Sequence, residues 1–311
     1  MMVHQLYVNG SNITDLVGDL SWSDNIDALG AKLEFNLAYS DMPKFPKKVV
    51  SIGDAVTLKN GKVLFQGIVI SESTSGRSPK KYICFDYAFY LNKSKTIIQF
   101  NKHAASEAIQ KVLTEYSIPN QIVGIPTRIS KIYKEDVISD IIKDILEQAT
   151  NETGTKYRLE MRAGVLHIER QRDLMINARI NLIGNPSRTQ SIEEMKNSIL
   201  IVSEGEKVSK IVAEAKNAGN IKKYGLLQEI QTVDKKDMAK AKNIASQLLK
   251  ELNVIREENS LELLGNDDVR SGRILRINEP VTGIVGDYLI TDCTHSFSNG
   301  IHRMSLSLGV A

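Results

Sequence analysis

The chain of 311 residues is poor in cysteine and contains only Cys84 and Cys293. Both lie in alternating, strand-like stretches, so they provide neither a disulfide framework nor the paired spacing of a zinc knuckle. Because free cysteine usually behaves as a small apolar side chain, we interpret both as buried, reduced thiols.

Long apolar runs are also missing. The opening stretch, MMVHQLYVNG, lacks the apolar segment of a secretory signal peptide, and no later stretch approaches the roughly 18 apolar residues of a spanning helix. We therefore expect that the protein does not insert into a membrane. We also expect that it is made as a soluble protein in a cytoplasm.

The chain lacks an excess of one charge sign, since 40 basic residues stand against 37 acidic ones and the net charge is +3. This balance excludes recognition of nucleic acid or membranes through overall charge. Basic clusters such as KFPKK (44–48) and KKDMAKAK (235–242) alternate with acidic segments and have no accompanying aromatic platform for base stacking. We expect no specific nucleic-acid binding.

Motifs for common cofactors and metals are absent as well: there is no Walker loop, GxGxxG, HExxH or EF-hand loop. The most enzyme-like cluster is Asp292-Cys293-Thr294-His295, where a thiol and an imidazole two residues apart share one face of a strand. The alternation of LITDCTHSFS favours a structural strand over a nucleophile and base. His167 and His302 also lie in strand patterns, so we assign no catalytic residue, no cofactor and no zinc.

Residues 1–95 contain several short, β-rich stretches separated by turn signals, which is typical of a barrel or sandwich. The clearest is VTLKNGKVLFQG (56–67), two β-rich arms around Asn60-Gly61. Asn-Gly favours positive φ at both central positions of a type I′ turn, so we predict a tight antiparallel hairpin.

The pattern changes to helical spacing from Asn101, a candidate N-cap, through Tyr116. A second helix is predicted over about 135–149, followed by a small hairpin (155–170) around Ala163-Gly164. A polar segment (183–198) marks a boundary, and the β-pattern then returns, interrupted by one helix over about 234–252 with Asp234 as candidate N-cap.

We therefore predict a mainly β fold with α+β insertions. Two β-barrel-like domains, residues 1–95 and 191–311, flank a helical and small-sheet domain, residues 96–190, and the second barrel carries the inserted helix.

Four stretches resemble one known family when read in order. LSWSDNIDALGAKLEFNLAYS (20–40), GDAVTLKNGKVLFQGIVIS (53–71) and FDYAFYLNKSKTIIQFNKHAASEAIQKVL (85–113) follow one another as in baseplate hub proteins of contractile phage tails, specifically the XkdQ/YqbQ-like group. GDYLITDCTHSFSNGIHRMSLSL (286–308) resembles that family's closing hairpin. Within these stretches we assign structural roles to Asn60, Gly61, Phe65, Gly67, Asp86, Leu91, Asn299 and Gly300.

The resemblance implies a homotrimeric hub, related in fold to the larger hub of T4-like phages and to the hub portion of type VI secretion spike proteins. Two barrels per chain would give a six-barrel ring that matches a hexameric tail tube to a trimeric spike. The implied partners are the tail tube or tube-initiator protein, the central spike and other baseplate proteins. The implied location is the baseplate of a virion or tail-like particle, phage or bacteriocin, after synthesis in the cytoplasm of a bacterial host.

Two other classes stay open. One is a monomeric β-rich module that binds carbohydrate or protein, which mass in solution would distinguish from a hub. The other is a cell-wall hydrolase, which we expect less because the chain leaves no room for a lysozyme or peptidase module after its last hairpin.

Overall fold

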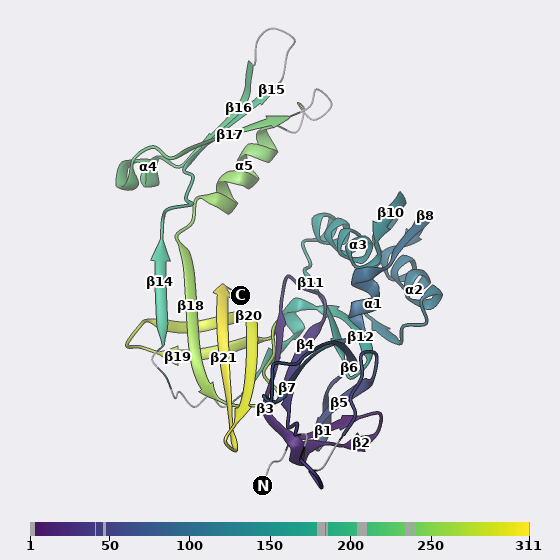
Figure 1. Cartoon of the computed structure of the whole chain (residues 1–311). Coiled ribbons are helices and arrows are strands. Elements are labelled where there is room, and N and C mark those ends of the chain that lie inside the picture. Colours follow the sequence, from purple (N-terminus) through teal and green to yellow (C-terminus); the bar gives the residue numbers. More distant parts are fainter. Residues whose placement is uncertain are drawn as a thin grey trace. The chain divides into compact units, whose positions relative to one another are not determined.

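The computed structural model describes residues 4–40, 42–45, 48–178, 184, 186–203, 210–233, 238 and 241–310 (Figure 1). The chain forms two compact units: unit 1 comprises Met1–Ser187 with Asn259–Ala311, and unit 2 comprises Arg188–Glu258. Among the described residues, no helix combines the length and the apolar character needed to cross a membrane. The expected fold class, mainly β with helical and small-sheet insertions, is confirmed.

The N-terminal part of unit 1 is an antiparallel sheet in the order β3-β4-β7-β6-β5-β1-β2. Alternate side chains of these strands point inward, as the burial pattern of β4 illustrates, and they form one apolar cluster that includes Leu6, Phe35 and Tyr82. The elements are β1 (Gln5–Val8), β2 (Ser11–Asn12), the 3₁₀ turn η1 (Thr14–Leu16), β3 (Val17–Asn25), β4 (Ala31–Leu37), β5 (Ala55–Asn60), β6 (Lys62–Ser73) and β7 (Lys80–Asp86).

The middle part of unit 1 contains helices and two small sheets. Strands β8 and β10 form an antiparallel ribbon, and β11, β12 and β9 form a second sheet in which β12 and β9 are parallel. The elements are α1 (Ala88–Lys93), β8 (Lys95–Ala104), α2 (Ala105–Glu115), β9 (Asn120–Ile122), β10 (Arg128–Val137), α3 (Ile138–Thr153), β11 (Tyr157–Arg162), β12 (Val165–Arg170) and η2 (Gln171–Asp173).

The first two of the three predicted helices are confirmed as α2 and α3. Their apolar stripes are buried in one cluster. The expected N-cap of the first helix is wrong. Asn101 lies in β8, and the helix begins after Ala104, whose backbone N–H donates to Glu107 Oε2 at 3.0 Å. The side chain of Glu107, in the first turn, is therefore the acceptor at the start of this helix. We had expected the side chain of Asn101 in that role.

The C-terminal part of unit 1 is built on β20 (Ile284–Ser298), which is paired antiparallel with three other strands: β19 (Ile274–Glu279), β21 (Ile301–Val310) and β3. The β3–β20 pairing runs from Asp292↔Asn25 to Phe297↔Leu20 and joins the first and last parts of the chain in one sheet. The remaining strands are β13 (Met175–Ile176), which pairs with β19, and β18 (Arg256–Leu264), which pairs with β21.

The Asn-Gly hairpin at residues 60–61 forms between β5 and β6, as predicted, but its turn type is not the expected one. φ is +69° at Gly61, whereas Asn60 is not among the residues with positive φ. A register shift between Leu58 and Lys59 changes how the arms meet at the turn. Positive φ at both positions occurs instead at Asn299 (52°) and Gly300 (78°), between β20 and β21.

Unit 2 contains β15 (Ser198–Ser203), β16 (Lys210–Lys216) and β17 (Gln228–Val233) in a sheet of their own, with β15 in the centre. Helix α5 (Ala241–Leu252) packs on this sheet and shares an apolar cluster with Ile199 and Ile201. The part of the predicted helix at residues 241–252 is confirmed, whereas Asp234 lies outside the described residues. Unit 2 also includes β14 (Ser187–Ser191), whose first residue belongs to unit 1, and the short helix α4 (Ala218–Tyr224).

The division of the chain into three domains at residues 95 and 190 stays a prediction. The strands β15, β16 and β17, which we assigned to the second barrel-like domain, pair with one another and cover the apolar stripe of α5. The apolar side chains of unit 1 gather in three further clusters, one in each of its N-terminal, middle and C-terminal parts.

Candidate functional site

Charged side chains from three distant parts of unit 1 meet in a buried group that we call the ionic cluster: Asp24 of β3, Arg158 and Glu160 of β11, and Arg270 and Arg273 before β19. Glu160 is 2% exposed and accepts hydrogen bonds from Arg273 Nη1 at 3.2 Å and Nη2 at 2.6 Å. Arg270 Nε lies 3.1 Å from Asp24 Oδ2 and 3.4 Å from Glu160 Oε2. Such mutual pairing is what buried charges require.

The charged groups of this cluster shift one another's pKa values. Burial alone raises the pKa of Glu160, but the neighbouring Arg270 and Arg273 outweigh burial and hold that pKa below its usual range. In the same way, Glu160 and Asp24 outweigh burial at Arg270 and raise its pKa. Glu160 and Arg270 therefore stay ionised, and the cluster links β3, β11 and the segment before β19 through charge-assisted hydrogen bonds.

Arg158 connects the same cluster to the β3–β4 connection. Its Nη1 donates to the Ile26 carbonyl oxygen at 2.8 Å and its Nη2 donates to Ser271 Oγ at 2.8 Å. Its side chain passes so close to Gly272, where φ is +77°, that a Cβ there would lie 2.3 Å from Arg158 Nε. Glycine at position 272 is therefore required by both the backbone conformation and the close approach.

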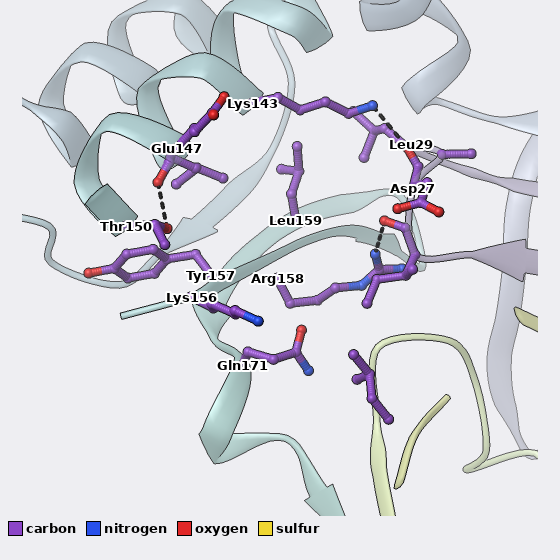
Figure 2. A pocket seen from close by; sticks show the side chains of 14 residues that line it. Asp27, Leu29, Lys143, Glu147, Thr150, Lys156, Tyr157, Arg158, Leu159 and Gln171 are labelled. Atoms are coloured by element: carbon purple, nitrogen blue, oxygen red, sulfur yellow. Dashed lines mark hydrogen bonds between the residues drawn. The ribbon is translucent and has the colours of Figure 1, made fainter. Parts of the chain in front are cut away.

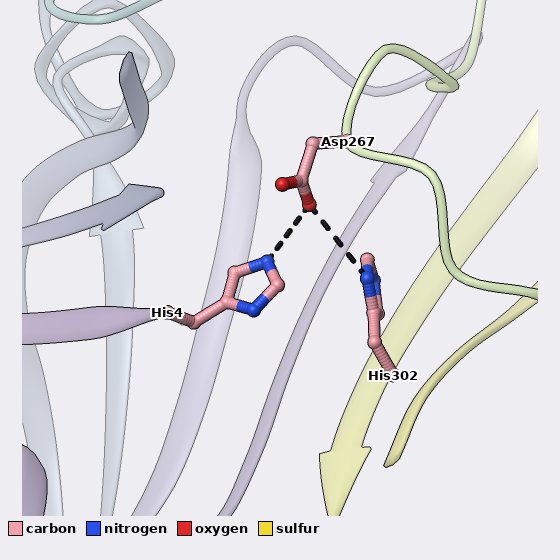
Figure 3. Close-up of side chains that lie close together, drawn as sticks. All are labelled: His4, Asp267 and His302. Carbon is pink, nitrogen blue, oxygen red and sulfur yellow. Dashed lines mark hydrogen bonds and ion pairs between the residues drawn. The ribbon is translucent and has the colours of Figure 1, made fainter. Parts of the chain in front are cut away.

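A second buried group, the imidazole cluster, contains His4, Trp22, Asp267, His295 and His302 (Figure 3 shows three of its members). The rings of Trp22 and His295 are stacked, with centroids 4.7 Å apart and an interplanar angle of 6°. His4 Nε2 lies 2.8 Å from Asp267 Oδ1, and His302 Nδ1 lies 3.8 Å from the same oxygen. These residues come from the N-terminal and C-terminal parts of unit 1, so the cluster also joins the two.

The thiol and imidazole that the sequence placed on one face do meet: Cys293 Sγ lies 3.2 Å from His295 Nε2. Burial raises the pKa of the Cys293 thiol well above its usual value and lowers the pKa of His295. Both groups are therefore neutral, and a neutral thiol is a poor nucleophile. The pair lacks the ionisation that covalent catalysis needs.

A cavity of about 430 Å³ lies between the β3–β4 connection, α3 and β11 (Figure 2). Its wall combines apolar side chains such as Leu29 and Leu159 with charged ones. Two of its cations already bind backbone oxygens: Lys143 Nζ donates to the Asp27 carbonyl oxygen at 2.9 Å, and Arg158 binds Ile26 as above. Among the described residues that line it, there is no cysteine, histidine or serine to act as a nucleophile with a base.

Four of the residues assigned structural roles lie near β6 and β7. Phe65 is 2% exposed, and Leu91 in α1 is fully buried. A Cβ at Gly67 would lie 2.1 Å from the Phe85 carbonyl oxygen, so the adjacent backbones approach more closely than any side chain permits. Asp86 accepts from the Ala31 N–H at 2.6 Å and the Ala88 N–H at 3.0 Å.

The other four form the two Asn-Gly turns. The Asn60 amide donates to Asp267 Oδ2 at 2.6 Å, so the hairpin tip contacts the imidazole cluster, and Gly61 provides the positive φ of that turn. Asn299 and Gly300 form the tip between β20 and β21. The structural roles of all eight residues stay predictions.

Sequence reasoning missed both buried clusters. The only local signal is the stretch Arg158-Leu159-Glu160-Met161-Arg162, where charged and apolar side chains alternate, and every residue from 158 to 161 is buried. The Arg273 partner of Glu160 lies 113 residues away, and His4 and Asp267 are 263 residues apart. Sequence spacing carries no information on contacts at such separations.

Comparison with known proteins agrees with this fold. The family described as YQBQ-like matches residues 20–309. The Bacillus subtilis protein YqbQ is 28% identical over 273 residues, and XkdQ of the phage-like element PBSX from the same organism is 27% identical over 269 residues; each alignment covers 83% of this chain and 82% of the relative.

Two solved structures show the same fold at low identity. The 43 kDa tail protein of prophage MuSo2 from Shewanella oneidensis has a TM-score of 0.75 at 12% identity, over 99% of this chain and 98% of that one. The E. coli protein c3393, a type VI secretion component described as structurally similar to the T4 tail proteins gp27 and gp5, has a TM-score of 0.59 at 10% identity, over 98% of this chain and 76% of that one. Since the family match covers nearly the whole sequence, the chain belongs to the YQBQ-like family, with the fold of phage tail proteins.

Proposed function

We propose that the protein is the structural hub of a contractile-tail baseplate, in a phage or a tail-derived bacteriocin. The observation that carries the proposal is the YQBQ-like family match over residues 20–309, together with a tail-protein fold along almost the entire chain. The similarity to c3393, itself described as resembling tail proteins gp27 and gp5, supports the hub in particular. The protein is then located at the baseplate of the particle.

The interior of unit 1 suits a part whose function is to hold shape. The β3–β20 pairing joins its N-terminal and C-terminal strands, and the ionic cluster attaches β11 to both. Breaking a buried ion pair leaves an uncompensated charge, so any motion between these parts is costly. A stiff body of this kind transmits geometry from one neighbour to the next, whereas an enzyme of the cysteine type needs an ionised thiol that burial prevents here.

In the proposed assembly, three chains form a ring, and each supplies two β-barrel-like parts, from about residues 1–95 and 191–311. Six similar parts around a threefold axis match a hexameric tail tube on one side and a trimeric spike on the other. Ring closure needs a contact between unlike surfaces of adjacent copies, repeated until the ring is complete. An obligate contact of this type buries more than roughly 2,000 Å².

The second candidate is a monomeric module that binds carbohydrate or protein. The observation that favours it is the cavity of about 430 Å³ beside α3, which combines apolar walls with charges of both signs. Cavities of this size hold small ligands in many proteins. A cell-wall hydrolase has no comparable support among the described residues.

Mass in solution separates these candidates. The untagged protein is measured by light scattering alone and after mixing with the spike and tube proteins of the same particle. If the protein is a hub, we expect a trimer, either alone or after the spike protein is added. The complex with the spike should contain three chains per spike trimer. A monomer that binds neither protein but binds a soluble glycan or peptide would favour the second candidate.

A further inference from the structure

His4, Asp267 and His302 each direct one possible ligand atom at a common point, and these atoms all lie within 4.8 Å of one another (Figure 3). His4 precedes β1, Asp267 lies between β18 and β19, and His302 lies in β21. The site is largely sealed from solvent, since His4 is 3% exposed and the side chains of Asp267 and His302 are each 14% exposed. Two imidazoles and one carboxylate are a common ligand set for Zn²⁺.

The positions of the protons follow from the neighbouring hydrogen bonds. His295 Nε2 lies 2.9 Å from the Val269 carbonyl oxygen, which only accepts, so this nitrogen carries a proton. In a neutral imidazole that is protonated at Nε2, the other nitrogen, Nδ1, is an acceptor. His302 Nε2, at 3.0 Å from that Nδ1, must therefore be the donor.

His302 then presents a lone pair to a carboxylate. A neutral imidazole that donates from Nε2 has its lone pair on Nδ1. That lone pair faces Asp267 Oδ1 at a distance of 3.8 Å. Two acceptors that face each other at this distance could both bind a cation placed between them.

His4 is the second imidazole at this carboxylate. Its Nε2 donates to Asp267 Oδ1 at 2.8 Å, and its Nδ1 is buried without a hydrogen-bond partner among the described residues. A divalent ion could replace the Nε2 proton and bind both His4 and His302 through neutral imidazoles. One cation would thus bridge the two imidazoles and Asp267.

The surroundings resemble those of a metal site. The Asn60 amide donates to Asp267 Oδ2 at 2.6 Å and leaves Oδ1 free to bind, while His295 accepts from the far nitrogen of His302. Metal-binding histidines and carboxylates usually have outer partners of this kind, which hold the ligand in its productive orientation.

We propose that His4, Asp267 and His302 form a binding site for one divalent transition-metal ion, with Zn²⁺ as the best match. Ligand atoms around tetrahedral Zn²⁺ are about 3.3 Å apart, given bonds of about 2.0–2.1 Å. The His4–Asp267 separation of 2.8 Å must therefore widen slightly, and His302 must approach. The two imidazoles must rotate to reach this spacing, and a water completes the shell.

The bound ion would connect the start of the chain to its last hairpin. His4 leads into β1, which lies next to the edge strand β2 of the N-terminal sheet, whereas His302 belongs to the C-terminal strand β21. A metal that binds the folded chain more tightly than the unfolded chain stabilises it. This inference does not depend on the proposed hub, because it concerns the fold of a single chain.

The experiment uses full-length protein without a polyhistidine tag, stripped with a chelator and dialysed into metal-free buffer. Zn²⁺ is then added, and bound metal and melting temperature are measured. We expect one Zn²⁺ per chain and a higher melting temperature. Asp267→Asn and His302→Gln should lose both effects, Asn60→Ala should weaken Zn²⁺ binding about 10–100-fold through the outer hydrogen bond, and the neighbouring Asp268→Asn should behave like wild type.

Co²⁺ added to the stripped wild type provides a test that needs no variant. Strong visible absorption bands of four-coordinate Co²⁺, removed by excess Zn²⁺, would support the site. The proposal would be overturned if stripped wild type bound no Zn²⁺ at equimolar concentration. It would also be overturned if folded His302→Gln protein bound Zn²⁺ as wild type does.

Discussion

The carboxylate of Glu160 in β11 accepts two hydrogen bonds from the guanidinium of Arg273, a residue 113 positions later in the chain. Both side chains are buried, with Glu160 2% and Arg273 6% exposed. The pair fixes the small sheet of the middle part to the segment that leads into β19. Because its geometry is bidentate, it defines the relative orientation of the two segments as well as their distance.

Glu160→Gln should destabilise unit 1 by about 3–5 kcal/mol, since it leaves buried guanidinium groups without their anion. The matched control is Asp287→Asn, which breaks the exposed bidentate pair with Arg276 and should have little effect. Urea unfolding can be followed by fluorescence of Trp22, the single tryptophan, which lies in β3 near Asp24. Equal losses in the two variants would contradict the role assigned to the ionic cluster.

Gly67→Ala should be strongly destabilising, by about 3 kcal/mol, because the new methyl group would collide with the backbone of Phe85. Gly124→Ala is the control: its φ is not positive, and a methyl group there would have no described atom within 4 Å apart from its own chain neighbours. Thermal melts of the two variants check this directly. A tolerated Gly67→Ala would show that β6 and β7 can separate without cost.

Asp86 should make the stability of unit 1 depend on pH. Burial raises its pKa to about 7, although the N–H groups of Ala31 and Ala88 and the positive charge of Arg270 lower it; Asp24 adds a smaller raising effect. A raised carboxyl pKa means that the folded state prefers the protonated form. The contribution of Asp86 is therefore complete below its unfolded pKa of about 3.9 and is lost as the pH rises to about 7.

Asp86→Asn removes this titration. The difference in unfolding free energy between wild type and Asp86→Asn should therefore become smaller as the pH rises from about 4 to about 7. Urea unfolding at a series of pH values measures it, and Asp287→Asn again serves as the surface control. A difference that grows with pH would show that the two backbone N–H donors dominate and that Asp86 is ionised in the fold.

Several elements could be predicted from the sequence because their signal is local. Helices α2 and α3 have continuous apolar stripes that repeat with helical period, and both stripes are buried. Helix α4 was missed because its seven residues have no such stripe and none of its side chains is buried. Asn217 is its N-cap, and the Asn217 side chain accepts a hydrogen bond from the Asn220 N–H.

Other features depend on partners that the sequence does not reveal. Asn-Gly has positive φ at both positions at residues 299–300, where we predicted no turn type, but not at 60–61, where the hairpin has a register shift. The strands β15, β16 and β17 are evident from their composition, but only the structure shows that they pair with one another. The same limit applies to the ionic and imidazole clusters, whose members are far apart in sequence.

Both cysteines should be unreactive in the native protein. Burial raises the pKa of Cys84 to about 12 and that of Cys293 well above its usual value, so neither forms the thiolate that attacks thiol reagents. A colorimetric thiol assay at pH 8 should detect almost no thiol before denaturation and two afterwards. Ser75→Cys, at an exposed loop position, is the positive control. Rapid labelling of native Cys293 would reopen the catalytic interpretation of its pairing with His295.

Electron microscopy of the protein with its proposed spike and tube partners tests whether this chain forms the hub of a baseplate. Class averages are collected for the protein alone, with the spike protein, and with both partners. The hub predicts threefold-symmetric rings with a central channel, present at the latest when the spike is added. Particles the size of a single chain in all three samples, with no attachment to spike or tube, would contradict it.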